Sequence, residues 1–116
     1  MRDYSEPPTG KGQGLRLGIA VVRGRSMQPS LYDGDRLLVN YAMNPHPGGL
    51  AVVRLPDGVL AVKRVTHREP GGWWVERDNP VEGVDSWTVG AIPDQDVVAS
   101  VLFRLWPPRS RGRAGR

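Results

Sequence analysis

The chain has 116 residues, 39% of them apolar, with 15 glycines, 11 prolines and no cysteine. A chain of this length is expected to form one domain, and the lack of cysteine excludes a disulfide framework, a thiol nucleophile and a cysteine-based metal site. The formal net charge of +4 comes from residues 106–116, which hold four of the 16 basic residues and no acid, so that the other 12 basic and 12 acidic residues cancel.

The many glycines and prolines argue against long helices and favour a small all-β domain. Residues 1–14 are expected to be a flexible N-terminus. They are polar, so they show no apolar core of a signal peptide. The first apolar run, LGIAVV, has six residues, far fewer than the ~20 that a membrane helix needs. We therefore expect a cytoplasmic protein without a membrane anchor.

The middle of the chain is typical of short strands separated by turns. The expected strands are residues 15–24, 36–42, 50–55, 59–67, 73–77 and 97–106. Pro56-Asp57-Gly58 predicts a hairpin turn, residues 26–35 a turn-rich crossing with room for one helical turn, and residues 78–96 mostly loop. Beyond the last strand, residues 107–116 are expected to be a disordered basic tail. The sequence thus predicts one all-β domain over residues 15–106 with short helical turns.

Ser26, in the stretch GRSMQPSLYD, is either a turn residue or a nucleophile. A serine nucleophile needs a base to take its proton. The two histidines, His46 and His67, show no local carboxylate partner for a Ser-His-Asp triad, and we interpret His67 as a surface residue. Two histidines without cysteine also make a zinc site improbable.

Lys63 is one of only two lysines in the chain, and it falls in the middle of an expected strand. Strand alternation places Ala61, Lys63 and Val65 on one face. If that face is buried, desolvation lowers the pKa of the amine, and a neutral amine can accept a serine proton where arginine cannot. The pattern alone favours an ordinary strand lysine with its charge in solvent, so both interpretations stay open at this point.

Several segments in a fixed order resemble the signal peptidase I family of Ser/Lys proteases (S26 type). They are GRSMQPSL, DGDRLLV, PGGLAVVRLPDG, VKRV and DNPVEGVDSWTVGAIP, and they span about residues 21–105. The serine segment alone is a weak motif, whereas the ordered set is specific. The resemblance implies a mainly antiparallel, small barrel-like all-β fold. It also implies a Ser/Lys peptidase that acts on a protein substrate and needs neither a cofactor nor a metal.

The resemblance also implies roles for individual residues. Ser26 is expected to be the nucleophile, with its backbone N–H as an oxyanion donor, and Lys63 the general base. Met27 and Pro29 are expected to shape the serine turn and the substrate cleft. The loop expected to support the lysine and brace the site contributes Asp78, Asn79, Asp85 and Ser86.

The chain departs from the family pattern around that loop. Arg77 stands where the family has glycine, and Gly83 replaces a hydroxyl residue that often bonds the lysine. Trp87 replaces an arginine, so Asp85 is expected to lose its usual partner. These departures predict a less well organised base, with Ser86 or water as the substitute partner of the lysine.

The chain most resembles a soluble branch of this family, the maturation proteases of nickel-type superoxide dismutase. This implies removal of an N-terminal pro-segment from the dismutase precursor. One alternative is a self-cleaving repressor-type Ser/Lys protease domain. Another is a small β-barrel module without catalysis that binds nucleic acid through the arginine tail and the Trp73–Trp74 pair. Adjacent strand tryptophans point to opposite faces, so nucleic acid is not the expected partner.

Overall fold

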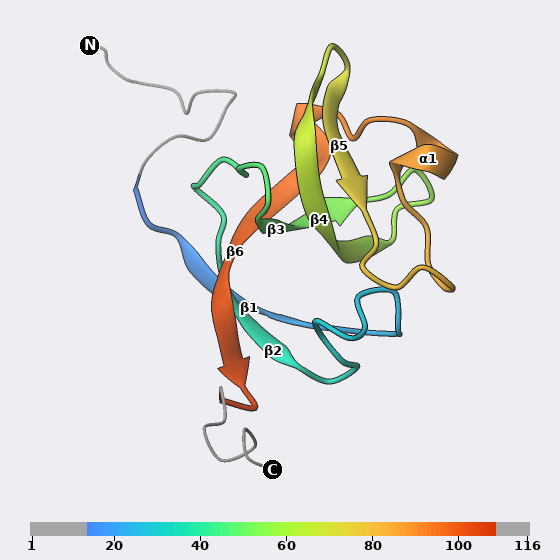
Figure 1. The fold of residues 1–116 in the computed structure, drawn as a ribbon. Helices are drawn as coiled ribbons and strands as arrows, with labels where there is room; N and C mark the ends of the chain where they lie inside the picture. The colour runs from blue at the N-terminus through green and yellow to red at the C-terminus, as the bar shows by residue number, and fades with distance from the viewer. Residues whose placement is uncertain (1–13, 109–116) are drawn as a thin grey trace, which may run out of the picture.

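The computed structural model describes residues 14–108, and the expectations for residues 1–13 and 109–116 lie outside this range. Six strands form one sheet in the order β1-β2-β6-β3-β4-β5 (Figure 1). The elements are β1 Leu17–Val21, β2 Arg36–Asn40, β3 Leu50–Arg54, β4 Leu60–Glu69, β5 Gly72–Glu76, α1 Ser86–Val89, the 3-10 turn η1 Asp94–Asp96 and β6 Val97–Trp106.

Every pair of neighbouring strands is antiparallel. This confirms the predicted mainly antiparallel all-β fold with short helical turns. The six strands lie inside the predicted ranges or extend them by no more than two residues. No helix within residues 14–108 has the length and apolar character to cross a bilayer.

The predicted hairpin between β3 and β4 is confirmed. Leu55 N–H donates to Val59 O at 2.9 Å and Gly58 N–H donates to Leu55 O at 2.7 Å. Gly58 has φ +89°, a conformation that glycine adopts without steric cost. The turn fixes the register of β4 on β3 and so places Lys63 opposite Ala51.

The last strand, β6, joins the two halves of the sheet. Its first residues pair with β3 and its later residues pair with β2. Figure 1 shows β6 running past β3 and β4 and on to β1 and β2. Because β6 pairs with both β2 and β3, it joins the N-terminal strands β1 and β2 to the strands β3, β4 and β5 in one sheet.

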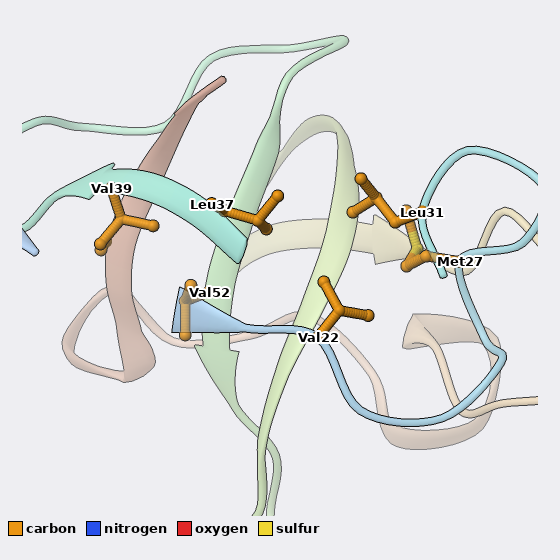
Figure 2. Packing of buried hydrophobic residues seen from close by; sticks show 7 residues of the cluster. Val22, Met27, Leu31, Leu37, Val39 and Val52 are labelled. Carbon is orange, nitrogen blue, oxygen red and sulfur yellow. The ribbon is translucent and has the colours of Figure 1, made fainter. Parts of the chain in front are cut away.

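Apolar side chains are buried in two clusters. The first comprises Val22, Met27, Leu31, Leu37, Val39, Val52 and Ala99 (Figure 2). The second comprises Ala51, Val53, Leu55, Val65, Val75, Ile92 and Val97. Strand β3 contributes to both, because successive side chains point to opposite faces. Burying each large apolar side chain contributes about 1.5–3 kcal/mol, so β3 is fixed from both sides.

The two edges of the sheet differ. At β5, Trp73 and Ile92 exchange backbone hydrogen bonds of 2.8 and 2.7 Å, and Val75 N–H donates to Ser86 Oγ at 2.9 Å. The outer side of β1 pairs with no strand within residues 14–108. Of the two edges, β1 is therefore the one that the described residues leave open.

Candidate active site

Ser26 lies in the segment that connects β1 to β2, on a turn that packs against the core through the next residue. The next residue, Met27, is 1% exposed and belongs to the first apolar cluster. Met27 O accepts from Leu31 N–H at 2.9 Å, which forms the single helical turn predicted here. Gly24 N–H donates to Asp33 Oδ1 at 2.7 Å. The side chain of Ser26 is thus presented by a segment anchored on both sides.

Lys63 lies in the middle of β4 and is 2% exposed. Its face of the strand carries Ala61 and Val65, which pack in or against the second apolar cluster. The predicted alternation is confirmed, whereas the alternative of a solvent-exposed strand lysine is wrong. Lys63 Nζ lies 3.1 Å from Ser26 Oγ, across 37 positions of sequence. The fold therefore brings the predicted nucleophile and base into hydrogen-bond contact.

The surroundings of Lys63 shift its amine towards the neutral form. Burial lowers the pKa of its amine from the usual 10.5, Asp85 opposes this by attraction, and Arg77 adds to the lowering by repulsion. Desolvation is the largest of the three influences, because the charged amine loses its water shell. A neutral amine 3.1 Å from the hydroxyl can accept its proton.

Asp78 and Asn79 brace the serine segment. Asn79 N–H donates to Ser26 O at 2.8 Å, and its side-chain amide donates to Arg25 O at 2.8 Å. Asp78 Oδ2 accepts from Ser30 Oγ at 2.6 Å. The structure therefore places these two predicted support residues against the loop of Ser26, while Lys63 is held by its own strand.

Asp78 is also tied to β4. Arg64 Nη2 donates to Asp78 Oδ2 at 2.6 Å. Partial burial raises the pKa of Asp78, but the bonds from Arg64 and Ser30 outweigh it and hold that pKa below its usual range. The carboxylate thus stays ionised and bridges β4 to the serine loop.

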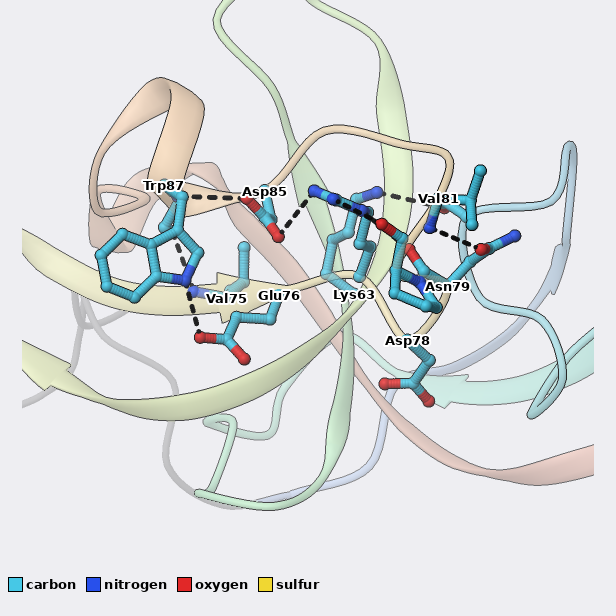
Figure 3. A network of polar contacts seen from close by, with 12 residues as sticks. Lys63, Val75, Glu76, Asp78, Asn79, Val81, Asp85 and Trp87 are labelled. Atoms are coloured by element: carbon cyan, nitrogen blue, oxygen red, sulfur yellow. Dashed lines mark hydrogen bonds and ion pairs between the residues drawn. The ribbon is translucent and has the colours of Figure 1, made fainter.

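Asp85 has an arginine partner, which corrects the expectation from the sequence. Arg77 Nη1 donates to Asp85 Oδ2 at 3.1 Å. The other carboxylate oxygen, Oδ1, accepts from Trp87 N–H at 3.2 Å and caps α1 (Figure 3). The residue that replaces the family's glycine therefore supplies the contact that the tryptophan at position 87 cannot make.

Ser86 does not substitute as the partner of Lys63. Its hydroxyl accepts from Val75 N–H at 2.9 Å and is buried, so it attaches α1 to β5. Within residues 14–108, the hydrogen bond of Lys63 Nζ is the one to Ser26 Oγ.

Gly83 is fixed by space as well as by backbone conformation. Its φ is +119°, and a Cβ at this position would collide with Ser26 Cβ and lie 3.1 Å from Arg77 Cδ. A serine at this position would displace Ser26. The glycine is therefore matched to the Ser26 turn and to Arg77, which gives it a structural reason beyond a lost hydroxyl.

The surface of the serine turn shows where an oxyanion can bind. Within residues 14–108, the backbone N–H of Ser26 has no acceptor, whereas Gly24 N–H is occupied by Asp33. Pro29 lies exposed on the same turn. Met27 lies beneath the turn, where its sulfur accepts from Asp78 N–H at 3.4 Å, so it shapes the turn from the core side.

Both histidines are exposed, as interpreted for His67 from the sequence. The expectation that neither has a carboxylate partner is wrong, because His67 Nε2 lies 2.6 Å from Glu69 Oε2. The ring of His67 also stacks on Trp74 at 5.9 Å. The hydroxyl of Ser26 is nonetheless bonded to Lys63, so the geometry favours lysine as the base.

The site contains residues that the sequence analysis did not assign. Arg64 and Ser30 hold Asp78, and Arg77 holds Asp85. Only Arg77 gave a signal in the sequence, as a charged residue in place of the family's glycine. The other two make contacts between segments far apart in the chain, which no local pattern encodes.

The sequence of this chain matches one protein family and two curated proteins. A family described as Peptidase S24-like matches residues 8–99. A probable signal peptidase I-1 of Synechocystis sp. is 28% identical over 113 residues, covering 89% of this chain and 51% of that protein. Mitochondrial inner membrane protease subunit 1 of Xenopus tropicalis is 26% identical over 120 residues, covering 81% of this chain and 72% of that protein. This chain thus spans about half the length of the Synechocystis protein, and the likeness to signal peptidases expected from the sequence is confirmed.

Proposed function

This chain belongs to the Peptidase S24-like family, and from that premise we propose that it is a serine endopeptidase with a Ser26/Lys63 catalytic dyad. The observation that carries the proposal is the 3.1 Å contact between Ser26 Oγ and a lysine amine that is 2% exposed. A buried lysine with a lowered pKa is the kind of base that can activate a serine hydroxyl. The open N–H of Ser26 supplies a donor for the oxyanion.

The reaction needs one residue to act as base and acid in turn. Ser26 Oγ attacks the scissile carbonyl carbon while Lys63 Nζ takes the hydroxyl proton, and the carbonyl oxygen becomes an oxyanion beside the Ser26 N–H. The C–N bond then breaks, and Lys63 returns the proton to the leaving amine. Water attacks the acyl-enzyme as Lys63 takes its proton, and that proton passes to Ser26 Oγ when the acid product leaves.

The substrate is proposed to bind as an added strand beside β1. This strand ends at Val21, five positions before Ser26, and its outer side pairs with no strand within residues 14–108. The competing edge at β5 is occupied by Ile92 and Ser86. Main-chain hydrogen bonds of an added strand give affinity that depends little on sequence.

The proposed substrate is a precursor protein with an N-terminal pro-segment, namely that of nickel-type superoxide dismutase. The support is the resemblance of the stretches GGWWVERDNP and VVASVLFRLWP to the soluble maturation proteases of that enzyme. The protease itself is proposed to act without a metal, through the Ser26 hydroxyl and the Lys63 amine.

The test is the intact mass of a purified nickel-dismutase precursor after incubation with this protein, beside a Ser26→Ala control. The substitution removes one oxygen from a half-buried side chain, so the variant is expected to fold, which circular dichroism checks. Loss of a defined N-terminal segment with the wild type alone is the expected result. Cleavage by Ser26→Ala contradicts the nucleophile, and no cleavage by the wild type contradicts the substrate.

A further inference from the structure

Arg77 follows directly on β5, and its side chain makes three hydrogen bonds, as many as that of Arg64. Nε donates to Asn79 O at 2.7 Å, Nη2 to Pro80 O at 3.1 Å and Nη1 to Asp85 Oδ2 at 3.1 Å. The planar guanidinium suits such a set of acceptors, which a lysine ammonium cannot match with the same geometry. Arg77 therefore fixes Asp85 relative to the main chain of the loop that contacts Ser26.

Asp85 needs that partner because its side chain is only 6% exposed. A carboxylate removed from water is stable only when it is paired and hydrogen-bonded. The other cation near it is Lys63, on which Asp85 acts by attraction. Within residues 14–108, the ion pair of Asp85 is nevertheless with Arg77.

The remaining charges around the dyad are engaged elsewhere. Arg64 points from the other face of β4 and pairs with Asp78. Glu76 accepts from the indole N–H of Trp87 at 3.1 Å (Figure 3), and Arg25 pairs with Glu82 at the exposed rim. The charge balance at Lys63 is accordingly set by Asp85 and Arg77.

We propose that Arg77 is a positioning residue that engages Asp85 and thereby keeps Lys63 able to accept the Ser26 proton. Arg77 touches neither reacting atom, and it acts through Asp85 and through its own charge. The inference rests on the proposed dyad for its meaning, but it concerns a property of Lys63 that exists without substrate.

The proposal predicts opposite effects of two substitutions. Arg77→Gln removes a positive charge and frees Asp85 to attract Lys63, so the pKa of Lys63 rises. Asp85→Asn removes the attraction while Arg77 still repels, so the pKa of Lys63 falls, and asparagine retains the ability to cap α1. The double variant Arg77→Gln/Asp85→Asn returns the pKa towards that of the wild type.

The experiment follows the NMR signals of lysine labelled at Cε as pH is raised. The chain has only two lysines, Lys11 and Lys63, and Lys63→Arg assigns the two signals. The control is Arg68→Gln, which removes the same charge from an exposed pair with Asp94. We expect about a tenfold fall in the neutral fraction of Lys63 at a given pH for Arg77→Gln, a rise for Asp85→Asn and no change for the control.

Two results overturn the proposal: Arg77→Gln leaves the titration of Lys63 unchanged, or Asp85→Asn moves it upwards. Because unfolding would also raise the pKa of Lys63, near-ultraviolet circular dichroism of the tryptophans checks the fold. If Arg77→Gln fails to fold, Asp85→Asn still tests the proposal, because a fall in the pKa of Lys63 cannot result from unfolding.

Cleavage supplies a second, independent readout. In Arg77→Gln, the acid side of the pH–rate profile is expected to move to higher pH while the rate at high pH is retained. A merely structural role for Arg77 would lower the rate at every pH. The titration needs no substrate, so a wrong dismutase assignment and a wrong role for Arg77 give distinguishable results.

Discussion

Two arginine–carboxylate pairs flank the dyad, and they differ in depth and in what they hold. The Arg64–Asp78 pair, at 2.6 Å, joins β4 to the serine loop, with side-chain exposures of 34% and 17%. The Arg77–Asp85 pair, at 3.1 Å, joins the end of β5 to the start of α1, with exposures of 26% and 6%.

The difference between the pairs follows from strand alternation. Arg64 and Lys63 are neighbours on β4 and point to opposite faces, so the pair of Arg64 acts on the loop of the nucleophile. Asp85 raises the pKa of the Lys63 amine by attraction, and Arg77 lowers it by repulsion. In the proposed mechanism, one pair thus positions the nucleophile Ser26 and the other adjusts the base Lys63.

Replacing Lys63 removes the amine on which the Arg77–Asp85 pair acts. Of the substitutions considered, it is expected to reduce the rate of cleavage the most. Lys63→Met keeps an apolar stem in an apolar site, and Lys63→Arg keeps the charge but cannot give up its proton. Both are expected to lose about 10²–10⁴-fold in the rate of precursor cleavage, the usual contribution of a general base. Near-normal activity of Lys63→Arg would contradict the assignment and direct attention to His67.

Gly83→Ala tests the close approach between the loop of the second pair and the nucleophile. Its Cβ would collide with Ser26 Cβ, and misplacing a reacting group by ~1 Å can cost about 10²-fold in rate. The matched control is Gly90→Ala, at φ +84° with open space around the added atom. Both variants lose stability through backbone strain, but only Gly83→Ala is expected to lose cleavage. Equal losses of activity would show that strain alone is responsible.

Asp78→Asn breaks the Arg64–Asp78 pair and tests whether its role differs from that of the Arg77–Asp85 pair. We expect about a tenfold fall in cleavage from a loosened Ser26 turn and a loss of ~1–3 kcal/mol in the free energy of unfolding. The titration of Lys63 should stay as in the wild type, unlike that of Asp85→Asn. A shifted Lys63 titration would mean that the pairs do not divide their roles as proposed.

The lowered pKa of Asp78 also predicts how the free energy of unfolding depends on pH. Its folded-state pKa is lowered, so its contribution is present above the unfolded-state pKa and is lost as pH falls through the folded-state value. Urea unfolding at decreasing pH should therefore show a shallower loss of stability in Asp78→Asn than in the wild type. Parallel curves for the two proteins would contradict an ionised, bonded Asp78.

His67→Ala is expected to have the smallest effect on cleavage. His67 is exposed and pairs with Glu69 and Trp74, whereas the hydroxyl of Ser26 is bonded to Lys63. Cleavage rates measured across neutral pH should match those of the wild type. A large loss would favour a histidine base and remove the distinction between the two arginine pairs.

Much of the fold could be predicted from the sequence, because strands and turns follow local rules. Strand alternation placed Lys63 on the face of Val65, and turn residues located the hairpin at Gly58. The same rule could have found the His67–Glu69 pair, since residues two apart on a strand share a face. The serine and the lysine were linked through a family resemblance, because their contact spans 37 positions.

The support of the site could not be predicted in the same way. The sequence predicts an unpaired Asp85, because tryptophan stands at position 87, where the family has the arginine partner. In the structure, the loop returns on itself and brings Arg77 to Asp85. Likewise, the absence of a side chain at Gly83 has its reason in the proximity of Ser26, which only the folded chain reveals.

The most direct test of this account is the pH at which Lys63 of the wild-type protein loses its proton, followed by the lysine Cε signal. The account predicts that Lys63 titrates below the usual 10.5 and that this signal is absent from Lys63→Arg. A Lys63 signal that titrates at or above 10.5 would show a charged amine beside Ser26, and it would contradict the dyad.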